Sequence, residues 1–509
     1  MSENKELQDK INGTAWKACD TLRTSIPGGD YKDYALTMLF LKYLSDTHKE
    51  EKEKAEEKYD GNQMMVERTL ARSKFQLTEE CTFDYLYNHR TDSDIGAKIN
   101  KALEKITDLN GVKLRNLFAG IDFNSEVVFG KVKEKNAILK TLLQDFNDPI
   151  LDLRPSKIGK MDIIGNCYEY LIARFAGDSG KKGGEFYTPG EVSTLMSKLV
   201  EPKENDRIYD PTCGSGSLLL KAASQVGEDK VSIYGQESNS STYNLCRMNM
   251  FLHGVNDAHI AWGDTLSNPL HLENDELMKF DVVVANPPFS LDKWAKGFDN
   301  TSGSEEFKME ASLDRFHRFD YGVPPKSIGD YAFVEHMIAS LAPDGRMAVV
   351  LPHGALFRGA SEGKIRQRIL EDNLIDAVIG LPQNLFYGVS IPATIVVIKK
   401  NRVNKDVLFI EASREYEKGK NQNRLRTEDI DHIVNTYKER KEEDKYSHLA
   451  SIDEIKENEY NLNIKRYVDT FEEEEQVDIE EVKKNIEETR NEINRLEDEL
   501  QKNLKELNL

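Results

Sequence analysis

Residues 281–289 read Asp-Val-Val-Val-Ala-Asn-Pro-Pro-Phe, and they give the clearest indication of the fold. The four consecutive apolar residues 282–285 are short and mostly β-branched, which is typical of a strand buried on both faces. This strand ends at Asn286, because Pro287 and Pro288 cannot donate hydrogen bonds to a neighbouring strand. Strands buried in this way belong to sheets covered by helices on both sides, so the stretch predicts an α/β fold.

The end of this predicted strand presents an amide, a backbone carbonyl and an aromatic ring together. The exocyclic amine of a heteroaromatic base is a poor nucleophile, because its lone pair is delocalised into the ring. The Asn286 side-chain oxygen and the Pro287 carbonyl could each accept one N–H and draw the nitrogen toward a tetrahedral geometry, with Phe289 stacked on the base. The alternative is a strand that simply stops at two prolines, with Asn286 as a turn former and Phe289 in the core. These residues alone do not decide between the two interpretations.

Composition limits the class of protein. The 509 residues allow about three domains. No apolar run approaches about 20 residues and no apolar leader follows Met1, so we expect no membrane span, no signal peptide and a cytoplasmic location. The five cysteines are scattered without a Cys-x-x-Cys pair, which argues against a disulfide framework and against a zinc site. We expect no metal.

The chain is acidic overall. Its 89 Asp and Glu residues exceed its 69 Lys and Arg residues, and the formal net charge is −20. A phosphate backbone repels such a chain, so a role with nucleic acid requires a local basic surface or a basic partner.

Helical periodicity dominates residues 1–150. Between Leu36 and Leu44, apolar residues recur at three- and four-residue spacing, which is typical of an amphipathic helix packed on a core. No residues in this part have catalytic spacing. We therefore interpret residues 1–150 as a helical domain for docking or support.

A second helical stretch, residues 163–175, leads into a glycine-rich and locally basic loop, residues 177–184. The next apolar-periodic helix is preceded by Thr188 and Pro189. Threonine is a good N-cap and proline is favoured at the first helical position, so the pair predicts a helix capped by Thr188.

A strand, a glycine loop and a helix follow in the order of a nucleotide-binding unit. Residues 208–209 are a short predicted strand that ends at Asp210, and the loop 211–217 contains Gly214 and Gly216. Glycines let the backbone approach a ligand closely, as in the dinucleotide-binding fingerprint. The third glycine of that fingerprint is missing, so a tight turn without a ligand remains an alternative.

Acidic residues follow the next two predicted strands. Glu237 follows strand 231–234, roughly where an acidic residue takes the ribose hydroxyls in nucleotide-binding folds. Asp264 follows a strand that begins at His259. Ligands of open α/β sheets bind at the carboxyl edge, where these strand ends and Asn286 are expected to meet. An NAD-dependent oxidoreductase would explain the glycine loop, but it leaves residues 286–289 unexplained.

Further elements are predicted after this region. We expect a helix from Asp330 to Leu341, a turn at residues 343–345, and strands at residues 346–351, 375–381, 394–398 and 407–410, with the last ones antiparallel. The polar stretch 290–328 is too long for an ordinary connection, and we predict that it orders over a substrate or a partner.

The last predicted helix, residues 479–507, is charged and carries apolar residues at alternating four- and three-residue spacing. This spacing is typical of a coiled-coil seam, which needs a partner helix. An intramolecular hairpin and a solvated tail are the alternatives. The seam consists of Val482, Ile486, Thr489, Ile493, Leu496, Leu500, Asn503 and Leu507.

Taken together, these stretches resemble the ordered motifs of the S-adenosylmethionine-dependent adenine-N6 DNA methyltransferases. More closely, the chain resembles the modification subunit of type I restriction-modification systems, from Trp16 to the C-terminal tail. The residues that carry the resemblance are 185–189 (EFYTP), 210–217 (DPTCGSGS), Glu237, Asp264 and 286–289 (NPPF), with further stretches at 351–358 and 460–467.

The resemblance implies roles for individual residues. The cofactor S-adenosyl-L-methionine would be held at its methionine end by Asp210, Thr212, Gly214, Ser215, Gly216 and Ser217. Glu185, Phe186, Tyr187, Thr188 and Pro189 would close over it. Glu237 would bind its ribose hydroxyls, and Asp264, with Thr265 and Leu266, its adenine. The target adenine would be held by Asn286, Pro287, Pro288 and Phe289 as the catalytic residues.

The resemblance also implies an organisation and partners. We expect a helical N-terminal domain (1–150), a Rossmann-like methyltransferase domain (151–470) and a C-terminal coiled-coil arm (471–509). The expected partners are double-stranded DNA, a DNA-specificity subunit contacted through the arm and the N-terminal domain, a second copy of the modification subunit, and a restriction subunit. If the specificity subunit supplies most phosphate contacts, this acidic chain alone should bind DNA weakly and without sequence preference. The alternatives are a methyltransferase for the side-chain amide of protein glutamine and a non-catalytic scaffold.

Overall fold

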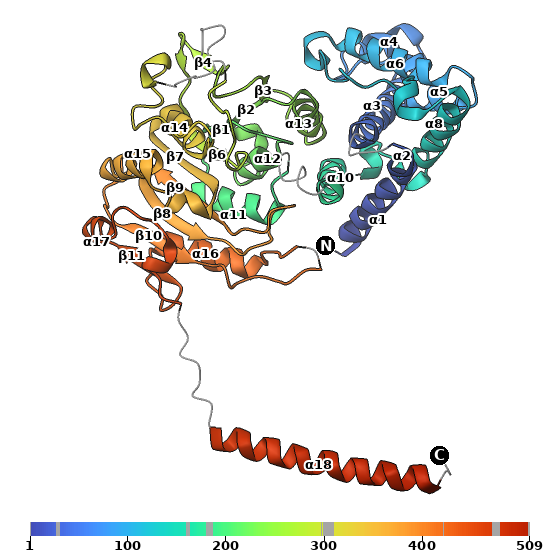
Figure 1. Ribbon diagram of the computed structural model, residues 1–509. Coiled ribbons are helices and arrows are strands. Elements are labelled where there is room, and N and C mark those ends of the chain that lie inside the picture. Colours follow the sequence, from blue (N-terminus) through green and yellow to red (C-terminus); the bar gives the residue numbers. More distant parts are fainter. Residues whose placement is uncertain are drawn as a thin grey trace. The chain divides into compact units, whose positions relative to one another are not determined.

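The structure is a computed structural model of the chain, and it describes residues 2–26, 31–158, 163–179, 187–296, 298, 310–420, 422–470 and 479–506. The chain forms two compact units, residues 1–468 and residues 469–509. The first unit contains a helical layer and an α/β layer, and the second contains one long helix (Figure 1).

The helical layer is built around α3, a long helix whose apolar side chains are buried along most of its first half. The ring of Tyr34 makes edge contacts with Phe123 and Phe129, with ring centroids 5.2 and 5.1 Å apart. The predicted helix at residues 36–44 is confirmed as part of α3, but its amphipathic character is not, because all of these residues are buried except the half-buried Tyr43. The helices of this layer are α1 (Ser2–Ala18), α2 (Asp20–Ser25), α3 (Tyr31–Lys58), α4 (Gln63–Leu70), α5 (Phe83–Asn88), α6 (Ile95–Asn110), α7 (Glu126–Phe129), α8 (Val132–Phe146), α9 (Pro155–Ile158) and α10 (Ile163–Ser179).

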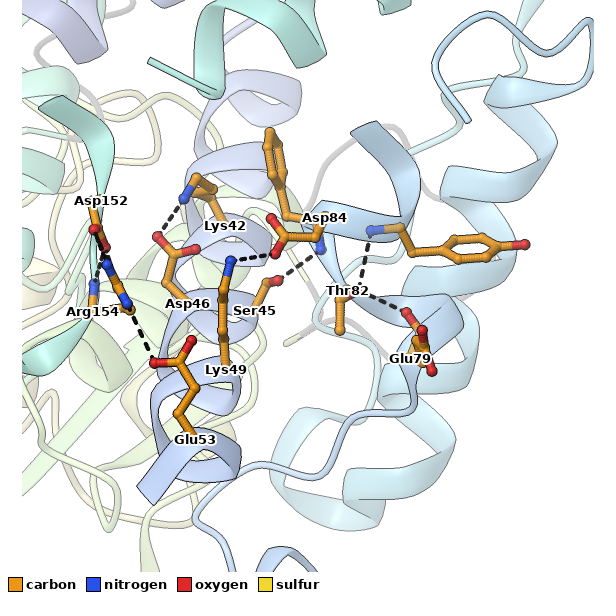
Figure 2. A network of polar contacts seen from close by, with 12 residues as sticks. Lys42, Ser45, Asp46, Lys49, Glu53, Glu79, Thr82, Asp84, Asp152 and Arg154 are labelled. Carbon is orange, nitrogen blue, oxygen red and sulfur yellow. Dashed lines mark hydrogen bonds and ion pairs between the residues drawn. The ribbon is translucent and has the colours of Figure 1, made fainter. Parts of the chain in front are cut away.

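A polar network on α3 fixes the segment that follows residue 150 (Figure 2). The buried Lys42 and Asp46 form an ion pair, and Asp46 also accepts a hydrogen bond from the Leu153 amide at 2.8 Å. Nearby, Ser45 accepts a hydrogen bond from the Phe83 amide at 2.8 Å. A buried charge that loses its partner costs about 3–5 kcal/mol. The network therefore resists separation of the 152–154 segment from α3.

The helical layer continues past residue 150 to the end of α10. Phe175 on α10 contacts Trp16 on α1 and Tyr31 on α3, with ring centroids 5.6 and 5.3 Å apart. The α/β layer contributes residues of α13 (Ser240–Leu252) to the same core, namely Leu245, Met248, Phe251 and Leu252. The two layers thus share one core instead of meeting only at their surfaces.

Among the described residues, the α/β layer contains a sheet of nine strands in the order β11-β10-β8-β9-β7-β6-β1-β2-β3. The strands are β1 (Arg207–Asp210), β2 (Ser232–Glu237), β3 (His259–Trp262), β6 (Phe280–Ala285), β7 (Leu341–Pro352), β8 (Ile375–Gly380), β9 (Ala393–Lys399), β10 (Val407–Glu411) and β11 (Ser447–Ala450). A separate hairpin joins β4 (Leu272–Glu273) and β5 (Glu276–Leu277).

The strand buried on both faces, predicted from residues 282–285, is β6. Val282 and Val284 lie in the core on one face of the sheet, and Val283 and Ala285 lie in the core on the other. The sheet is thereby covered by helices on both sides (Figure 1). One face packs against α11 (Gly190–Val200), α12 (Ser217–Ser224), α13 (Ser240–Leu252) and α16 (Thr427–Glu439), and the other against α14 (Asp330–Ser340), α15 (Ala360–Glu371) and α17 (Ile452–Glu457).

The predictions for the later strands are correct in place and partly wrong in geometry. The predicted turn at residues 343–345 lies within β7. Phe280 of β6 pairs with Leu341 and Val282 pairs with Arg346, so the register of the two strands shifts across this turn. The strand 394–398 lies within β9 and is antiparallel to both its neighbours. The strand 407–410 lies within β10, which is antiparallel to β11 but parallel to β8, so the predicted antiparallel pairing is correct on one side only.

Part of the long stretch 290–328 is packed on the α/β layer. Trp294 is buried, its indole nitrogen donates to the Pro325 carbonyl at 2.8 Å, and its ring lies 5.2 Å from that of Phe319. The described portion therefore has a small core of its own, shared with Leu266. Residues 297 and 299–309 lie outside the described residues, and ordering over a substrate or partner stays a prediction.

The second unit contains α18 (Ile479–Glu506), in agreement with the predicted helix. Ile486, Ile493, Leu496 and Leu500 are each at least half exposed on it. None of the helices in the described part of the chain is both long and apolar enough to cross a membrane.

Candidate active site

The predicted site residues gather where the strand order reverses. β1 pairs with β2 on one side and with β6 on the other, all three in parallel, and β3 continues the sheet beyond β2. The chain therefore leaves the carboxyl ends of β1 and β6 in opposite directions, which opens a crevice at that edge. A narrow cavity there is lined by Tyr187, Thr188, Asp210, residues 212–215 and Asn286, among others.

Asp210 ends β1 as a buried carboxyl group with few polar neighbours. Its side chain is 2% exposed, and it accepts a hydrogen bond from the Thr212 amide at 2.9 Å. Burial raises the pKa of Asp210 to about 8, and the nearby Glu237 adds to the shift. Among the described residues, no Lys or Arg side chain offsets it. A cationic group placed in the cavity would therefore favour the charged carboxylate.

The glycine loop after β1 depends on glycine at Gly216. Its φ is +80°, in the left-handed region, and a Cβ atom there would lie 2.6 Å from the Met250 side chain and 2.8 Å from the Cys246 sulfur. Gly214 also has positive φ, +55°. A side chain at Gly216 would displace the side chains of Met250 and Cys246 on α13, so this glycine serves the packing of the loop as well as its turn.

Glu237 ends β2 and binds the glycine loop. One carboxyl oxygen accepts from the Gly214 amide at 3.0 Å, and the other accepts from the Asn239 amide at 2.7 Å. Burial raises the pKa of Glu237, against the effect of these hydrogen bonds. The oxygen bound to Asn239 also accepts from the Ser238 hydroxyl at 3.4 Å, whereas the one bound to Gly214 retains a further lone pair for a ligand hydroxyl. The predicted role at a ribose is thus compatible with a second role in shaping the loop.

The residues after β3 divide into one exposed acid and two buried neighbours. Asp264 is exposed and accepts from the Leu266 amide at 2.9 Å. Thr265 donates its hydroxyl to the Pro211 carbonyl at 2.5 Å. The Leu266 side chain is fully buried beside Trp294. Thr265 and Leu266, both predicted to bind the cofactor, are thus buried behind the loop, and Asp264 is the exposed residue of the three.

The predicted capping role of Thr188 is wrong. α11 begins at Gly190 with Pro189 in the N-cap position, and no side chain caps it. The Thr188 hydroxyl instead accepts a hydrogen bond from the Asn286 amide nitrogen at 3.1 Å. This contact turns the side-chain oxygen of Asn286 away from Thr188 and leaves it as an acceptor. Glu185 and Phe186, also predicted to close over the cofactor, lie outside the described residues.

Phe289 has an aromatic neighbour that the sequence did not indicate. The ring of Phe386, from the loop after β8, lies 6.0 Å from that of Phe289 at an interplanar angle of 65°. The adjacent Tyr387 lies 6.1 Å from the ring of Tyr187. The only signal in the sequence is an aromatic pair shortly after a predicted strand, about 100 residues from Phe289, and such a pair is common in cores.

A second missed group supports the exit from β6. The amide of Ser290, a residue with φ of +52°, donates to the buried Asp330 at 2.6 Å. Arg358 pairs with Asp330 and, at 2.6 Å, with Glu362. This chain of charges fixes the backbone directly after Pro288 and Phe289. Asp330 was predicted only as the start of a helix.

The described residues contain no group of three or more His, Cys, Asp or Glu side chains arranged to hold a metal ion. Asp210 and Glu237 are suited to a cationic and hydroxyl-bearing ligand, and Asn286 and Phe289 to a flat amine beside it.

Two family models match the chain, one over most of the helical layer and the other over α10 and the α/β layer. The model of the N-6 DNA Methylase family matches residues 159–476, and that of the HsdM N-terminal domain matches residues 11–146. Proteins of similar sequence indicate the same family. The methylase subunit of the type I restriction enzyme MpnII from Mycoplasma pneumoniae is 33% identical, over 93% of this chain and 92% of its own length. That of MjaVIII from Methanocaldococcus jannaschii is 34% identical, over 96% and 83%.

A solved structure matches as well. The crystal structure of the type I restriction-modification system methyltransferase subunit from Streptococcus thermophilus superposes with a TM-score of 0.79 at 37% identity, covering 91% of this chain and all of that one. The fold and the matched families place the chain among the S-adenosylmethionine-dependent methyltransferases. Within that class, the chain belongs to the N-6 DNA methylase family of type I restriction enzyme methylase subunits.

Proposed function

We propose that this protein is the modification subunit of a type I restriction-modification complex and methylates the N6 amine of adenine in double-stranded DNA. The observation that supports this most is the contact between Asn286 and Thr188 at the carboxyl end of β6. It holds an amide oxygen ready to accept an N–H, at the crevice between β1 and β6 and beside the buried Asp210. The crevice thereby offers an amine pocket next to a site for a cation.

The residues at the crevice suit S-adenosyl-L-methionine as the cofactor. Asp210 would take its ammonium group, because the buried carboxyl has a raised pKa and, among the described residues, no cationic neighbour. Glu237 would take the ribose hydroxyls, and Asp264 the adenine amino group. When bound, the cofactor supplies a methyl group on a positively charged sulfur.

The chain's own contribution is to position and activate the target amine. The adenine N6 faces its pairing partner inside the duplex, so the nucleotide must be flipped out, at a cost of a few kcal/mol. Asn286 and Pro287 would each accept one N–H, and these hydrogen bonds strengthen as the nitrogen becomes tetrahedral. Phe289 would stack on the base. Holding the amine in line with the methyl group supplies much of the rate, and no strong base is needed.

The C-terminal helix is proposed to recruit the specificity subunit. Ile486, Ile493, Leu496 and Leu500 follow the seam spacing on α18 and are 50–61% exposed. Exposed apolar rows at this spacing are buried when a partner helix packs on them. The protein would then obtain its sequence recognition from that subunit, which accommodates its net charge of −20.

The test is to identify the methylated product. The complex assembled with its specificity subunit is incubated with labelled cofactor and duplex DNA that contains the recognised site, and the DNA and protein are digested. We expect label on N6-methyladenine. Label on glutamine of a protein would favour the glutamine methyltransferase, and no label on any acceptor would favour the scaffold.

A further inference from the structure

A groove lies beside the proposed base pocket, and nothing in the mechanism above uses it. It is lined by α10, by residues 384 and 386–390 after β8, and by residues 417–420, 422 and 424 after β10, and we call it the α10 groove; the described residues between 417 and 424 are called the hairpin 417–424. β8 and β10 are both parallel to the strands of the site, so these loops leave the same carboxyl edge. The groove volume is about 840 Å³, which is within the range of ligand-binding clefts.

The α10 groove adjoins the site through two aromatic contacts. Phe386 and Tyr387 both line the groove. Phe386 also contacts Phe289, and Tyr387 contacts Tyr187. On α10, Gly177 lies against Tyr387, where a Cβ atom would be 3.3 Å from the ring. A ligand that extends from the base pocket along this wall would therefore enter the groove.

The groove is basic in an acidic chain. Four cationic side chains line it against two carboxylates, Asp178 and Glu417, whereas the whole chain carries a charge of −20. Lys418, Lys420 and Arg424 are exposed, and none of them forms an ion pair within the described residues. The fourth cation, Arg174, lies over the Trp16 and Tyr170 rings, with its guanidinium 5.7 and 5.2 Å from their centroids. Arg424 also interacts electrostatically with Glu191, without an ion pair, so within the described part of the chain Lys418 and Lys420 are the cations of the groove most available to a ligand.

The hairpin that carries these charges is held in place. The backbones of Glu417 and Arg424 exchange two hydrogen bonds, of 2.8 and 3.0 Å. Asn423 then binds the loop after β8, with its side chain donating to the Gln383 carbonyl at 2.8 Å. The turn requires Gly419, because a Cβ atom there would overlap the Gln422 carbonyl oxygen. Lys418 and Lys420 therefore flank a closely packed backbone position, Gly419.

We propose that the α10 groove binds the phosphodiester backbone of the DNA strand that carries the target adenine, next to the flipped nucleotide. This inference rests on the proposed function. Flipping rotates a nucleotide about its backbone, so the flanking phosphates have to be held beside the pocket. Lysine and arginine contacts to phosphate provide affinity and register without reading the sequence. Sequence would still be read by the partner subunit.

The test compares methyl transfer by the assembled complex containing K418Q/K420Q with that of the wild-type complex. We expect KM for DNA to rise several-fold, while kcat at saturating DNA and the affinity for the cofactor stay at wild-type values. The slope of log affinity for DNA against log salt should fall by about 1 for each phosphate that is no longer neutralised, so by about 2 for the double variant.

The matched control is K203Q/K405Q, which makes the same change of charge at exposed lysines before β1 and β10, at the opposite edge of the sheet. The control should behave as wild type. Unchanged KM and salt slope in K418Q/K420Q, or equal changes in both double variants, would overturn the proposal. Loss of complex assembly in K418Q/K420Q would also overturn it and make the groove a subunit contact. If the wild-type complex methylates no DNA, the proposed function fails instead.

Neutral backbone linkages provide a positional test. One phosphate at a time, next to the target adenine, is replaced by a methylphosphonate. At the contacted phosphate we expect weaker binding by wild type and little further weakening in K418Q/K420Q, because both changes remove the same interaction. Equal losses of affinity in both proteins at every flanking position would contradict the assignment.

Discussion

The side-chain amide of Asn286 has one oxygen and one nitrogen, and Thr188 determines which of them faces the pocket. Its hydroxyl accepts from the amide nitrogen at 3.1 Å, so the oxygen remains for the target amine. We expect Thr188→Val to let the amide rotate and to lower the methyl-transfer rate by about tenfold, equivalent to about 1.4 kcal/mol. The measurement is single-turnover transfer to DNA by the assembled complex.

Thr188→Ser is the matched control, because it keeps the hydroxyl, and it should retain most of the rate. Because Thr188 also lines the cavity proposed for the cofactor, the rates are compared at saturating cofactor. A wild-type rate in Thr188→Val would show that Asn286 does not need this contact.

The buried Asp210 should make cofactor affinity depend on pH. Burial raises its pKa to about 8, so in the ligand-free protein the carboxyl is largely protonated at neutral pH. A cationic ligand favours the ionised form, and binding then releases a proton. We expect the affinity for S-adenosylmethionine to rise with pH, by up to about tenfold per unit between pH 6 and pH 7, below the pKa of an α-amino group at about 7.7–8.0. Isothermal titration calorimetry across this range measures it.

Asp210→Asn cannot ionise and provides the comparison. It should bind the cofactor weakly and with little dependence on pH. A flat profile in the wild-type protein, or the same slope in Asp210→Asn, would remove Asp210 from the ammonium site.

At this scale the sequence predicted the site residues from strand ends and spacing, which are local patterns. Asp210, Glu237 and Asn286 lie at the strand ends where such patterns placed them. The partners of these residues could not be predicted in the same way. Thr188 meets Asn286 across 98 residues, and Phe386 meets Phe289 across a comparable distance. Contacts of this kind depend on how the strands are ordered in the sheet.

At the scale of secondary-structure elements, the segment before the hairpin 417–424 is attached to α16 through a hydrogen bond between the Glu415 side chain and His432. Burial lowers the pKa of His432, but hydrogen bonds to Glu415 and Glu443 outweigh it and raise the pKa above its usual value of about 6.5. The protonated histidine therefore stabilises this attachment below about pH 6.5, and the contribution is lost as pH rises through the raised pKa. We expect amide-exchange protection of residues 415–420 and 422–424 to fall over that range.

His432→Gln removes the titrating group, so protection in this variant should not change with pH over the same range. A pH-independent wild-type protein would contradict the expectation, as would an unchanged pH dependence in His432→Gln.

The α18 helix offers a test of assembly. Ile493 lies in the exposed apolar row, whereas Asn491 lies on the opposite side of the helix in the heptad register. Ile493→Arg should abolish or strongly weaken co-purification with the specificity subunit, because it places a charge in the buried seam. Asn491→Arg adds the same charge and should assemble normally, as measured by size-exclusion chromatography of the mixed subunits.

Normal assembly by Ile493→Arg would exclude the α18 seam as the contact.

Strand directions show why the pairing of elements has to be tested and cannot be assumed from a sequence pattern. The apolar run at residues 407–410 predicted a strand, but its parallel pairing with β8 follows from the crossover that the chain makes before it. Periodicity indicates which face of an element is buried and not which partner covers it.

At the scale of the whole molecule, the helical layer and the α/β layer share a core through α13. Phe251 on α13 contacts Phe75 and Phe40 in the helical layer, with ring centroids 5.6 and 6.3 Å apart. The sequence predicted both layers, because each has its own periodicity. It could not predict their union, since α13 has buried residues on both sides and periodicity does not assign each side to a layer. The domain boundary near residue 150 stays a prediction.

The distribution of charge also becomes interpretable at this scale. The chain is strongly acidic, yet the α10 groove gathers cationic side chains beside the base pocket. A protein that binds a short stretch of backbone and takes its sequence recognition from a partner needs positive charge only locally.

The central claim is that Asn286 accepts an N–H of the target adenine while the amine attacks the methyl group. The most direct measurement is the single-turnover rate of methyl transfer by the assembled Asn286→Ala complex, with cofactor and DNA both saturating. The account predicts a rate at least about 100-fold below wild type, as for the loss of one hydrogen bond that strengthens in the transition state, with binding of cofactor and DNA retained. A rate close to wild type in Asn286→Ala would contradict it.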